Sequence, residues 1–294
     1  MKNPKSRIKF AFFGTPKLAA VMLDELEKSA YIPAIVVTAP DRPKGRGLAL
    51  AKSEVKSWAQ KRNIPVLQPE KLDDAFVREL KGAHCDLFIV IYYGKIIPRA
   101  VLDIPKHGTL NIHFSLLPRF RGTSPVRSAI LNDERNTGIS IILLDEKIDH
   151  GPIIAQKKIP PPAGGWPPRA SELEEISTRE SAELLIKMLP SWIAGEIDAH
   201  EQNHDVATYC ENLTKEAGLI NLSDDAYKNL LKIRAFDSTI GTHAFFERNG
   251  KKVRVGIVDA HIKNNLLAIE TVKPEGKREM KYEEFLRSGA KPFE

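Results

Sequence analysis

Residues 8–38 read IKFAFFGTPKLAAVMLDELEKSAYIPAIVVT, in which two apolar runs flank a segment with helical spacing. The apolar run at 8–13 predicts a strand, and Pro16 suits the first turn of a helix. Apolar residues then recur at helical spacing through residue 29, and a second apolar run follows at 32–38. A strand, a helix and a strand in this order make one β-α-β unit with a right-handed crossover. The sequence therefore predicts an α/β domain with parallel strands.

Outward from this unit, residues 86–94 (DLFIVIYYG) are the most apolar strand candidate in the chain. A continuously apolar strand is typical of the buried centre of a parallel sheet. Ligands of such sheets bind at the carboxyl ends of the strands, which here carry Tyr92, Tyr93 and Gly94. Neither GxGxxG nor GxxxxGK[ST] is present, which argues against a phosphate-binding turn at Gly14.

Residues 109–125 (TLNIHFSLLPRFRGTSP) begin as a strand and then change into a loop. Asn111 and His113 are two residues apart, so they project from the same face. The following Ser-Leu-Leu-Pro and Arg-Gly segments cannot continue a strand or a helix. Together with Asp149, which follows the next predicted strand at 139–144, these residues form a candidate site at the carboxyl edge of the sheet.

These three residue types suit the polarisation of a carbonyl group. An asparagine donates an N–H to an oxyanion, and a histidine donates when it is charged, a form that a nearby aspartate favours. Such a set supports direct attack by an amine on an acyl group without a covalent enzyme intermediate. For a lone histidine the ordinary interpretation is a buried structural residue, but the Asn-x-His spacing and the Asp149-His150-Gly151 loop favour a catalytic one.

Other chemistries lack their motifs. Ser115 lies close to His113, but no GxSxG elbow is present. No HExxH motif occurs, and Cys85 and Cys210 lack the spacing of metal ligands, so we expect no metal site and no disulfide framework. No window approaches the roughly 18 apolar residues that a membrane span requires. We therefore expect a cytoplasmic protein that does not enter membranes.

The basic residues are concentrated in one segment. Seven basic residues and one acidic residue lie between Arg42 and Arg62, and their net charge of +6 equals that of the whole chain. The segment 39–50 contains prolines and glycines, and we expect it to form an irregular loop. Charge alone leaves two interpretations open, a solvated face and a binding surface for an anionic partner, and the concentration in one loop favours the second.

The length of 294 residues suits two domains. We expect a catalytic domain at 1–194, a polar linker at 195–205 and a second domain at 206–294. Short strand-like segments dominate the second domain, with turn signals at 249–250 and 274–276, so they predict a small antiparallel β domain.

The motifs also carry a family resemblance. The segment 111–122, the later Asn136-Thr-Gly-Ile and Asp149-His-Gly resemble the signature of the folate-dependent formyltransferases. Within that family, Pro40-Asp-Arg-Pro-Lys-Gly-Arg-Gly47 resembles the basic loop of the members whose acceptor is methionyl initiator tRNA. The similarity continues through Thr208-Tyr209, Lys215-Glu216 and the Ile-Arg-Ala-Phe run at 233–236, so it covers nearly the whole chain.

The resemblance implies a Rossmann-like catalytic domain, a linker and a C-terminal β-barrel of OB-like type that binds tRNA. It implies a formyl donor, 10-formyltetrahydrofolate, and an acceptor, the α-amino group of methionyl initiator tRNA. By position, Asn111 and His113 would stabilise the oxyanion. Asp149 would keep His113 charged and help to take the proton of the amine.

The resemblance also implies the binding residues and leaves alternatives open. The folate site would be lined by Ser115, Leu116, Leu117, Pro118, Tyr92, Tyr93 and Gly94. The tRNA would be bound by Arg42, Lys44 and Arg46, and the enzyme would act as a monomer. Phe114 stands where family members have a small residue, which predicts a narrower folate pocket. The alternatives are another amine acceptor such as an amino sugar nucleotide, hydrolysis of formyltetrahydrofolate, and a tRNA-binding module without activity.

Overall fold

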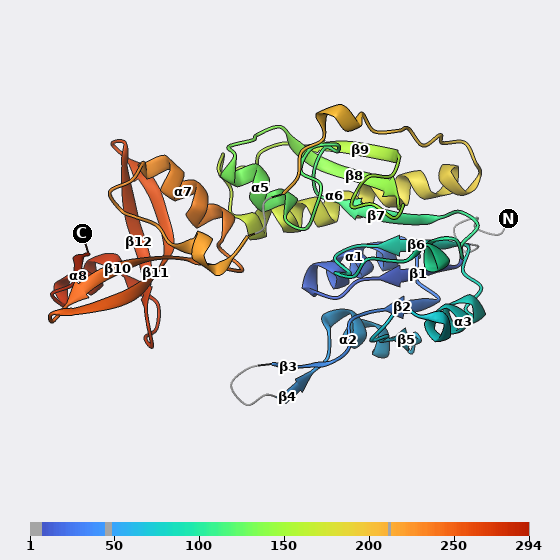
Figure 1. Ribbon diagram of the computed structural model, residues 1–294, viewed down its shortest axis with the longest axis horizontal. Helices are drawn as coiled ribbons and strands as arrows, with labels where there is room; N and C mark the ends of the chain where they lie inside the picture. Colours follow the sequence, from blue (N-terminus) through green and yellow to red (C-terminus); the bar gives the residue numbers. More distant parts are fainter. Residues whose placement is uncertain (1–7, 45–48, 211–212, 294) are drawn as a thin grey trace. The chain divides into compact units, whose positions relative to one another are not determined.

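The computed structural model describes residues 8–44, 49–210 and 213–293, and the chain divides into two compact units (Figure 1). Unit 1 comprises Met1–Gly122, Gly138–Ile159 and Glu175–Tyr209. Unit 2 comprises Thr123–Thr137, Pro160–Glu174 and Cys210–Glu294. The chain thus passes between the units several times, whereas the sequence predicts a single crossing at residues 195–205.

Unit 1 is built on a seven-stranded sheet with the order β5-β2-β1-β6-β7-β8-β9. The predicted β-α-β unit consists of β1 (Phe10–Phe13), α1 (Lys17–Lys28) and β2 (Ile35–Val37), and β1 pairs in parallel with both β2 and β6. The sheet is parallel from β5 to β7, and β8 is antiparallel to β7. The other strands are β5 (Val66–Leu67), β6 (Leu87–Val90), β7 (Thr109–His113), β8 (Thr137–Leu143) and β9 (Ile153–Ile159).

The core of unit 1 follows from the apolar strands. All residues of β1 and β6 are buried, as expected for central strands that are covered on both faces. The helices are α2 (Glu54–Gln60), α3 (Asp74–Gly82), α4 (Arg99–Leu102) and α6 (Ala170–Ile193), and the first turn of α6 belongs to unit 2. Ser53 caps α2 by accepting a hydrogen bond from the backbone N–H of Lys56, as the sequence predicts.

The prediction that residues 39–50 are irregular is wrong. Arg42–Lys44 form β3 and Ala49–Ala51 form β4, and the two strands pair antiparallel as a separate two-stranded sheet. Pro43 lies opposite Leu50 within this ribbon. A proline is compatible with it because a two-stranded ribbon consists only of edge strands, which do not need every backbone N–H for pairing.

Unit 2 contains a five-stranded sheet with the order β13-β12-β11-β10-β14. Its pairings are antiparallel, which together with the sheet of unit 1 confirms the predicted fold class. Asn249 and Gly250 both adopt positive φ in the β10–β11 turn, as an Asn-Gly hairpin requires. The elements are α5 (Pro125–Leu131), α7 (Ala226–Ala235), β10 (Thr242–Arg248), β11 (Lys251–Lys263), β12 (Leu266–Pro274), β13 (Met280–Lys281), α8 (Tyr282–Arg287) and β14 (Lys291–Pro292).

Candidate active site

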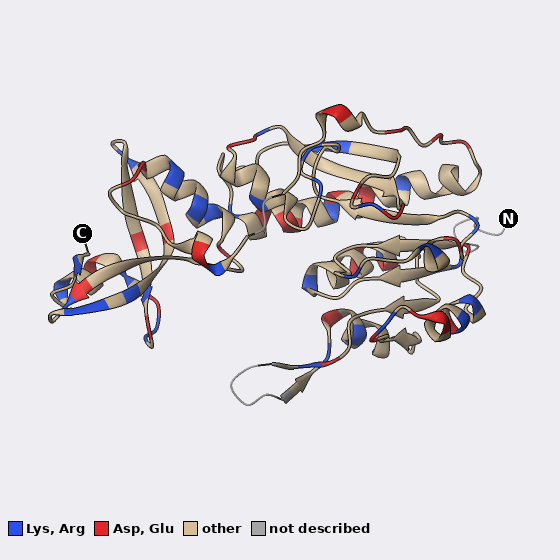
Figure 2. Cartoon of the chain, in the orientation of Figure 1, with Lys and Arg blue, Asp and Glu red and all other residues tan. Residues whose placement is uncertain are grey.

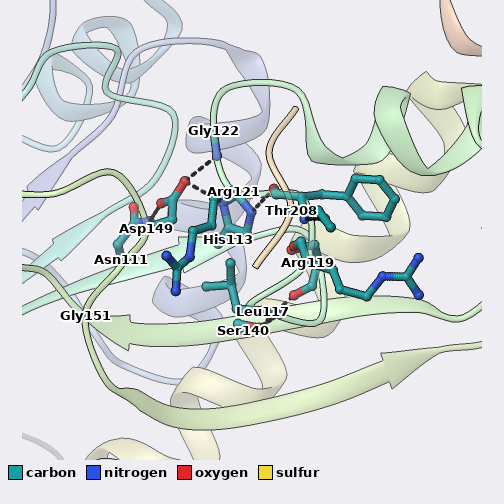
Figure 3. Close-up of polar contacts among 12 residues, drawn as sticks. Asn111, His113, Leu117, Arg119, Arg121, Gly122, Ser140, Asp149, Gly151 and Thr208 are labelled. Atoms are coloured by element: carbon teal, nitrogen blue, oxygen red, sulfur yellow. Dashed lines mark hydrogen bonds and ion pairs between the residues drawn. The ribbon is translucent and has the colours of Figure 1, made fainter. Parts of the chain in front are cut away.

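Asn111, His113 and Asp149 lie together in unit 1, as the sequence predicts (Figure 3). Asn111 and His113 are on β7, and Asp149 is on the loop between β8 and β9. The amide Nδ2 of Asn111 donates to Oδ1 of Asp149 at 3.2 Å, and Nδ1 of His113 lies 3.4 Å from Oδ2. β8 runs antiparallel to β7 and ends beside its first residues, and the loop after β8 turns back so that Asp149 contacts Asn111 and His113.

The imidazole of His113 faces an oxygen atom at each nitrogen. Nε2 lies 2.8 Å from the carbonyl oxygen of Phe120, and Nδ1 faces the carboxylate of Asp149. A carbonyl oxygen only accepts hydrogen bonds, so Nε2 must carry a proton. The ring is 5% exposed, so these contacts decide its orientation. Phe120 itself adopts φ +56°, a left-handed conformation that side-chain-bearing residues rarely adopt.

Asp149 is held by backbone as well as side-chain donors. Its Oδ2 accepts the N–H of Gly122 at 2.8 Å, and its backbone is left-handed with φ +46°. A left-handed non-glycine residue costs about 1 kcal/mol, a cost that surrounding contacts must offset. Gly151, two residues later, admits no side chain, because a Cβ there would lie 1.9 Å from the carbonyl oxygen of Leu143. The loop is therefore tightly confined beside β8.

The residues expected to line the folate site divide into two groups. Ser115 and Leu117 are buried: the Ser115 hydroxyl donates to the carbonyl oxygen of Arg119 at 2.5 Å, and the N–H of Leu117 donates to Ser140. These two residues shape the loop from inside. Leu116 and Pro118 are only half-buried and retain accessible surface.

The residues at the end of β6 also divide into a buried one and others with accessible surface. The Tyr93 ring is buried in the core against Phe13, and burial raises the pKa of its phenol to about 12. Gly94 is exposed with φ +79°. Tyr92 is half-buried, and its ring contacts that of Phe114 with a centroid separation of 5.1 Å. Since β6 and β7 pair in parallel, these residues end beside the Asn111 strand.

Several residues that hold the cluster escaped the sequence analysis. The carbonyl of Phe120 and the N–H of Gly122 flank Arg121, whose guanidinium is 2% exposed. Gln202 contacts Arg121 and lies 81 positions away in the chain. The Thr208-Tyr209 pair was recognised only as part of the family resemblance. A backbone group leaves no signature in a sequence, and no local pattern pairs residue 121 with residue 202.

Two of the three residues expected to bind tRNA lie on the β3–β4 ribbon. Arg42 and Lys44 belong to β3, and Arg46 lies outside the described residues. Part of the basic segment is internally neutralised, because Lys56 pairs with Asp41 at 2.6 Å and Arg62 pairs with Glu27 at 2.6 Å. The hydrogen bond from Lys56 lowers the pKa of the Asp41 carboxyl. The positive charge open to a partner is therefore smaller than the composition suggests.

A second basic surface lies on one face of the sheet of unit 2. Nζ of Lys252 lies 4.3 Å from the ring centroid of Phe245 and 4.5 Å from that of Phe293. Beside them Arg254, opposite Phe245 across the strand pair, donates to Nδ1 of His243 at 3.3 Å. Burial and then the charge of Arg254 lower the pKa of His243. We call these five residues the aromatic–basic face; Figure 2 shows where lysine and arginine lie on unit 2.

Neither a metal cluster nor a membrane span was found in the part of the chain that the structure describes. No group of three or more His, Cys, Asp or Glu side chains among those residues is placed to hold a metal ion. No helix within the described ranges is long and apolar enough to cross a membrane.

A Rossmann-like sheet that ends in an Asn–His–Asp cluster defines an α/β enzyme suited to the transfer of a carbonyl group. The family model "Formyl transferase" matches residues 6–163. The methionyl-tRNA formyltransferase of Thermodesulfovibrio yellowstonii is 35% identical over 95% of both chains. That of Chloroflexus aurantiacus is 41% identical over 84% of this chain and 79% of its own. The chain therefore belongs to the formyl transferase family and, within it, to the methionyl-tRNA formyltransferases.

A solved structure agrees on the fold. The methionyl-tRNA formyltransferase from Clostridium thermocellum has a TM-score of 0.59 and is 17% identical, covering 91% of this chain and 98% of its own. At this identity the likeness concerns the arrangement of strands and helices.

Proposed function

We propose that this enzyme transfers the formyl group of 10-formyltetrahydrofolate to the α-amino group of methionyl initiator tRNA, and so supports translation initiation. The observation that carries the proposal is the contact of Asn111 and His113 with Asp149 at the end of β7, in a chain of this family. In the transfer, the amine nitrogen bonds to the formyl carbon and the bond from that carbon to the donor nitrogen breaks. The amine loses a proton and the donor nitrogen gains one, so that tetrahydrofolate leaves.

Each residue of the cluster has a distinct part in the proposed reaction. The amide of Asn111 has two N–H groups; one donates to Asp149, and the other is offered to the developing oxyanion. Nε2–H of His113, which contacts the carbonyl of Phe120, is shared with the oxyanion as charge develops. Asp149 lies beside Nδ1 of His113, stabilises its charged form and helps to take the proton of the amine.

The residues beside the cluster fit a folate. A pterin ring requires an apolar wall and polar partners for its edge. Half-buried Tyr92, Leu116 and Pro118 supply the wall, and exposed Gly94 leaves its backbone accessible. These four would hold the donor, and 10-formyltetrahydrofolate supplies the formyl group when bound. Ser115, Leu117 and Tyr93 support the wall from inside, because they are buried.

A solved structure of the same fold supports this assignment of the donor. The N-formyltransferase of Helicobacter canadensis was solved with folinic acid and dTDP-3-aminofucose, and it covers 87% of this chain with a TM-score of 0.62 at 21% identity. Its second ligand is an amino sugar nucleotide, so the same fold also binds a molecule other than tRNA.

Two surfaces favour a tRNA acceptor. Arg42 and Lys44 lie on β3, and the aromatic–basic face combines exposed cations with the half-buried ring of Phe245 and the exposed ring of Phe293. Cations that contact phosphates, together with aromatic rings on which bases stack, are typical of nucleic-acid binding. We propose that residues 206–294 bind tRNA through this face, and that one cytoplasmic monomer carries out the reaction.

The test supplies 10-formyltetrahydrofolate with one acceptor at a time. We expect formylation of methionyl initiator tRNA and at most slow reaction with methionyl elongator tRNA, free methionine or an amino sugar nucleotide. Release of formate in the absence of an acceptor measures hydrolysis. Faster turnover of the sugar nucleotide, or of water, than of the initiator tRNA would overturn the proposal.

A further inference from the structure

The segment from His200 to Tyr209, which we call the strap, belongs to unit 1 and is hydrogen-bonded to the loops of that unit at several points. His200 and Ile153 exchange both backbone hydrogen bonds, at 2.7 and 2.8 Å. At the other end, Thr208 donates its N–H to the carbonyl of Pro118, and its carbonyl accepts the N–H of Arg121 at 2.8 Å. The strap therefore spans the two loops that carry the contacts of His113 and Asp149.

Gln202, in the middle of the strap, joins these two loops through its side chain. Nε2 donates to the carbonyl oxygen of Asp149 at 2.9 Å and to that of Gly151 at 2.7 Å. Oε1 accepts from NH2 of Arg121 at 2.7 Å and from Nε at 3.2 Å. The amide is 5% exposed, and all its hydrogen-bonding groups are used. One side chain thus links the backbone of Asp149 to residue 121.

The position of Arg121 determines the geometry of the loop that follows β7. The carbonyl of Phe120 contacts His113, and the N–H of Gly122 donates to Asp149, so a shift of Arg121 moves both groups. The guanidinium of Arg121 contacts three residues of the strap: Gln202, Nδ1 of His204 at 2.8 Å and the hydroxyl of Tyr209 at 3.5 Å. Its orientation depends on the strap.

Two strained residues need this support. Phe120 and Asp149 both have left-handed backbones. The N–H of Phe120 donates to Oγ1 of Thr208 at 2.9 Å, and the carbonyl of Asp149 accepts from Gln202. Left-handed conformations at a functional site persist where the surrounding structure holds them. The strap makes one hydrogen bond to each strained residue, between Thr208 and Phe120 and between Gln202 and Asp149.

We propose that Gln202 and Thr208 are positioning residues for formyl transfer, which act through Asp149 and His113 by fixing the two loops. This inference rests on the proposed catalytic roles of those two residues. A displacement of about 1 Å at reacting groups costs on the order of 100-fold in rate. Loss of a strap contact should therefore lower kcat and leave the KM values for both substrates within about threefold.

The experiment compares variants of the full-length enzyme by steady-state formylation. Q202L removes both the donor and the acceptor of the amide. Q202E keeps an acceptor for Arg121 but loses the donors to the carbonyls of Asp149 and Gly151. We expect both to lower kcat by about 10- to 100-fold. E201Q, which changes an exposed neighbour in the same strap, should keep the kcat of the parent enzyme. T208V should be slower than the parent, and T208S, which retains the hydroxyl, should recover most of the loss.

Two readouts separate positioning from general destabilisation. In a D149N background, Q202L should lower kcat by a clearly smaller factor than in the parent, because only its effect through His113 remains. The amide of Gly122 should exchange faster with solvent in Q202L, while those of β1 and β6 stay protected. Equal losses in both backgrounds, or a folded Q202L with the parent kcat and the parent Gly122 exchange, would overturn the inference. Parent-like activity of H113A and D149N would instead overturn the proposed catalytic site.

Discussion

The Asn111–His113–Asp149 cluster and the aromatic–basic face differ in how their side chains are held. In the cluster, His113 is buried and Asp149 is half-buried, and distances of 2.8–3.4 Å to side-chain and backbone groups determine the geometry. On the face, Lys252 and Arg254 are exposed and are supported by rings and by one histidine. The first arrangement orients groups for bond making, and the second offers charge over an area.

The difference predicts how each region responds to substitution. Mutually hydrogen-bonded groups act as a unit, so substitutions in the cluster should cause large and non-additive losses of kcat. Exposed cations that contact phosphates act almost independently. Substitutions on the aromatic–basic face should therefore cause losses of tRNA affinity that are small, additive and dependent on salt. The following experiments test this contrast, beginning with the largest expected effect.

The His113→Ala variant should lose on the order of 1,000-fold in kcat, because the proposed donor to the oxyanion and the partner of Asp149 are both removed. Single-turnover formylation at saturating tRNA measures the effect, and circular dichroism verifies the fold. His107→Ala, at a second histidine of unit 1, serves as the matched control and should remain active. An H113A enzyme with more than a tenth of the parent kcat would remove His113 from the chemistry.

The Asn111→Ala variant should lose about 100-fold in kcat, the usual cost of one oxyanion donor. Its effect is expected to be smaller than that of His113, since the Gly122 N–H still holds Asp149 in place. The same single-turnover assay applies, with Asn132→Ala as the amide control because Asn132 caps the end of α5. If the fold-losses in kcat of N111A and H113A multiply in the double variant, the cluster does not act as a unit.

Lys252→Ala and Arg254→Ala should each weaken tRNA binding by roughly three- to tenfold and leave kcat at saturating tRNA unchanged. Each should also reduce the slope of log Kd against log salt by about 1, because one phosphate contact is lost. Titration of labelled initiator tRNA at several salt concentrations measures both quantities. Lys187→Ala, an equal change of charge on α6, is the control. Unchanged affinity and slope would show that this face is only solvated.

His243 should make a small, pH-dependent contribution to stability. Its pKa in the folded protein lies below its ordinary value, so the unfolded chain binds a proton first as the pH falls. Stability should therefore decrease as the pH drops from about 7 through the ordinary histidine pKa of about 6.5. We expect the fall in Tm between pH 7.5 and 5.5 to be roughly 1–2 °C smaller in His243→Gln than in the parent. An identical fall in both proteins would contradict this.

Much of the fold was predictable because it rests on local periodicity. The apolar run at 8–13, the helix after Pro16 and the Asn-Gly turn each encode their conformation within a few residues. The β3–β4 ribbon was missed because prolines and glycines are typical of loops, and its pairing depends on residues several positions apart in the chain.

By itself, the sequence determined that Asn111 and His113 share one face of a strand, since a period of two is a property of the extended backbone. It also determined that the strand ends in a loop, because Pro118 restricts the backbone and Gly122 allows conformations that other residues avoid. Only the tertiary structure decided that Phe120, Gly122 and Gln202 hold the cluster. Their contacts are long-range, and most use backbone groups that every residue possesses, so only the folded path of the chain selects them.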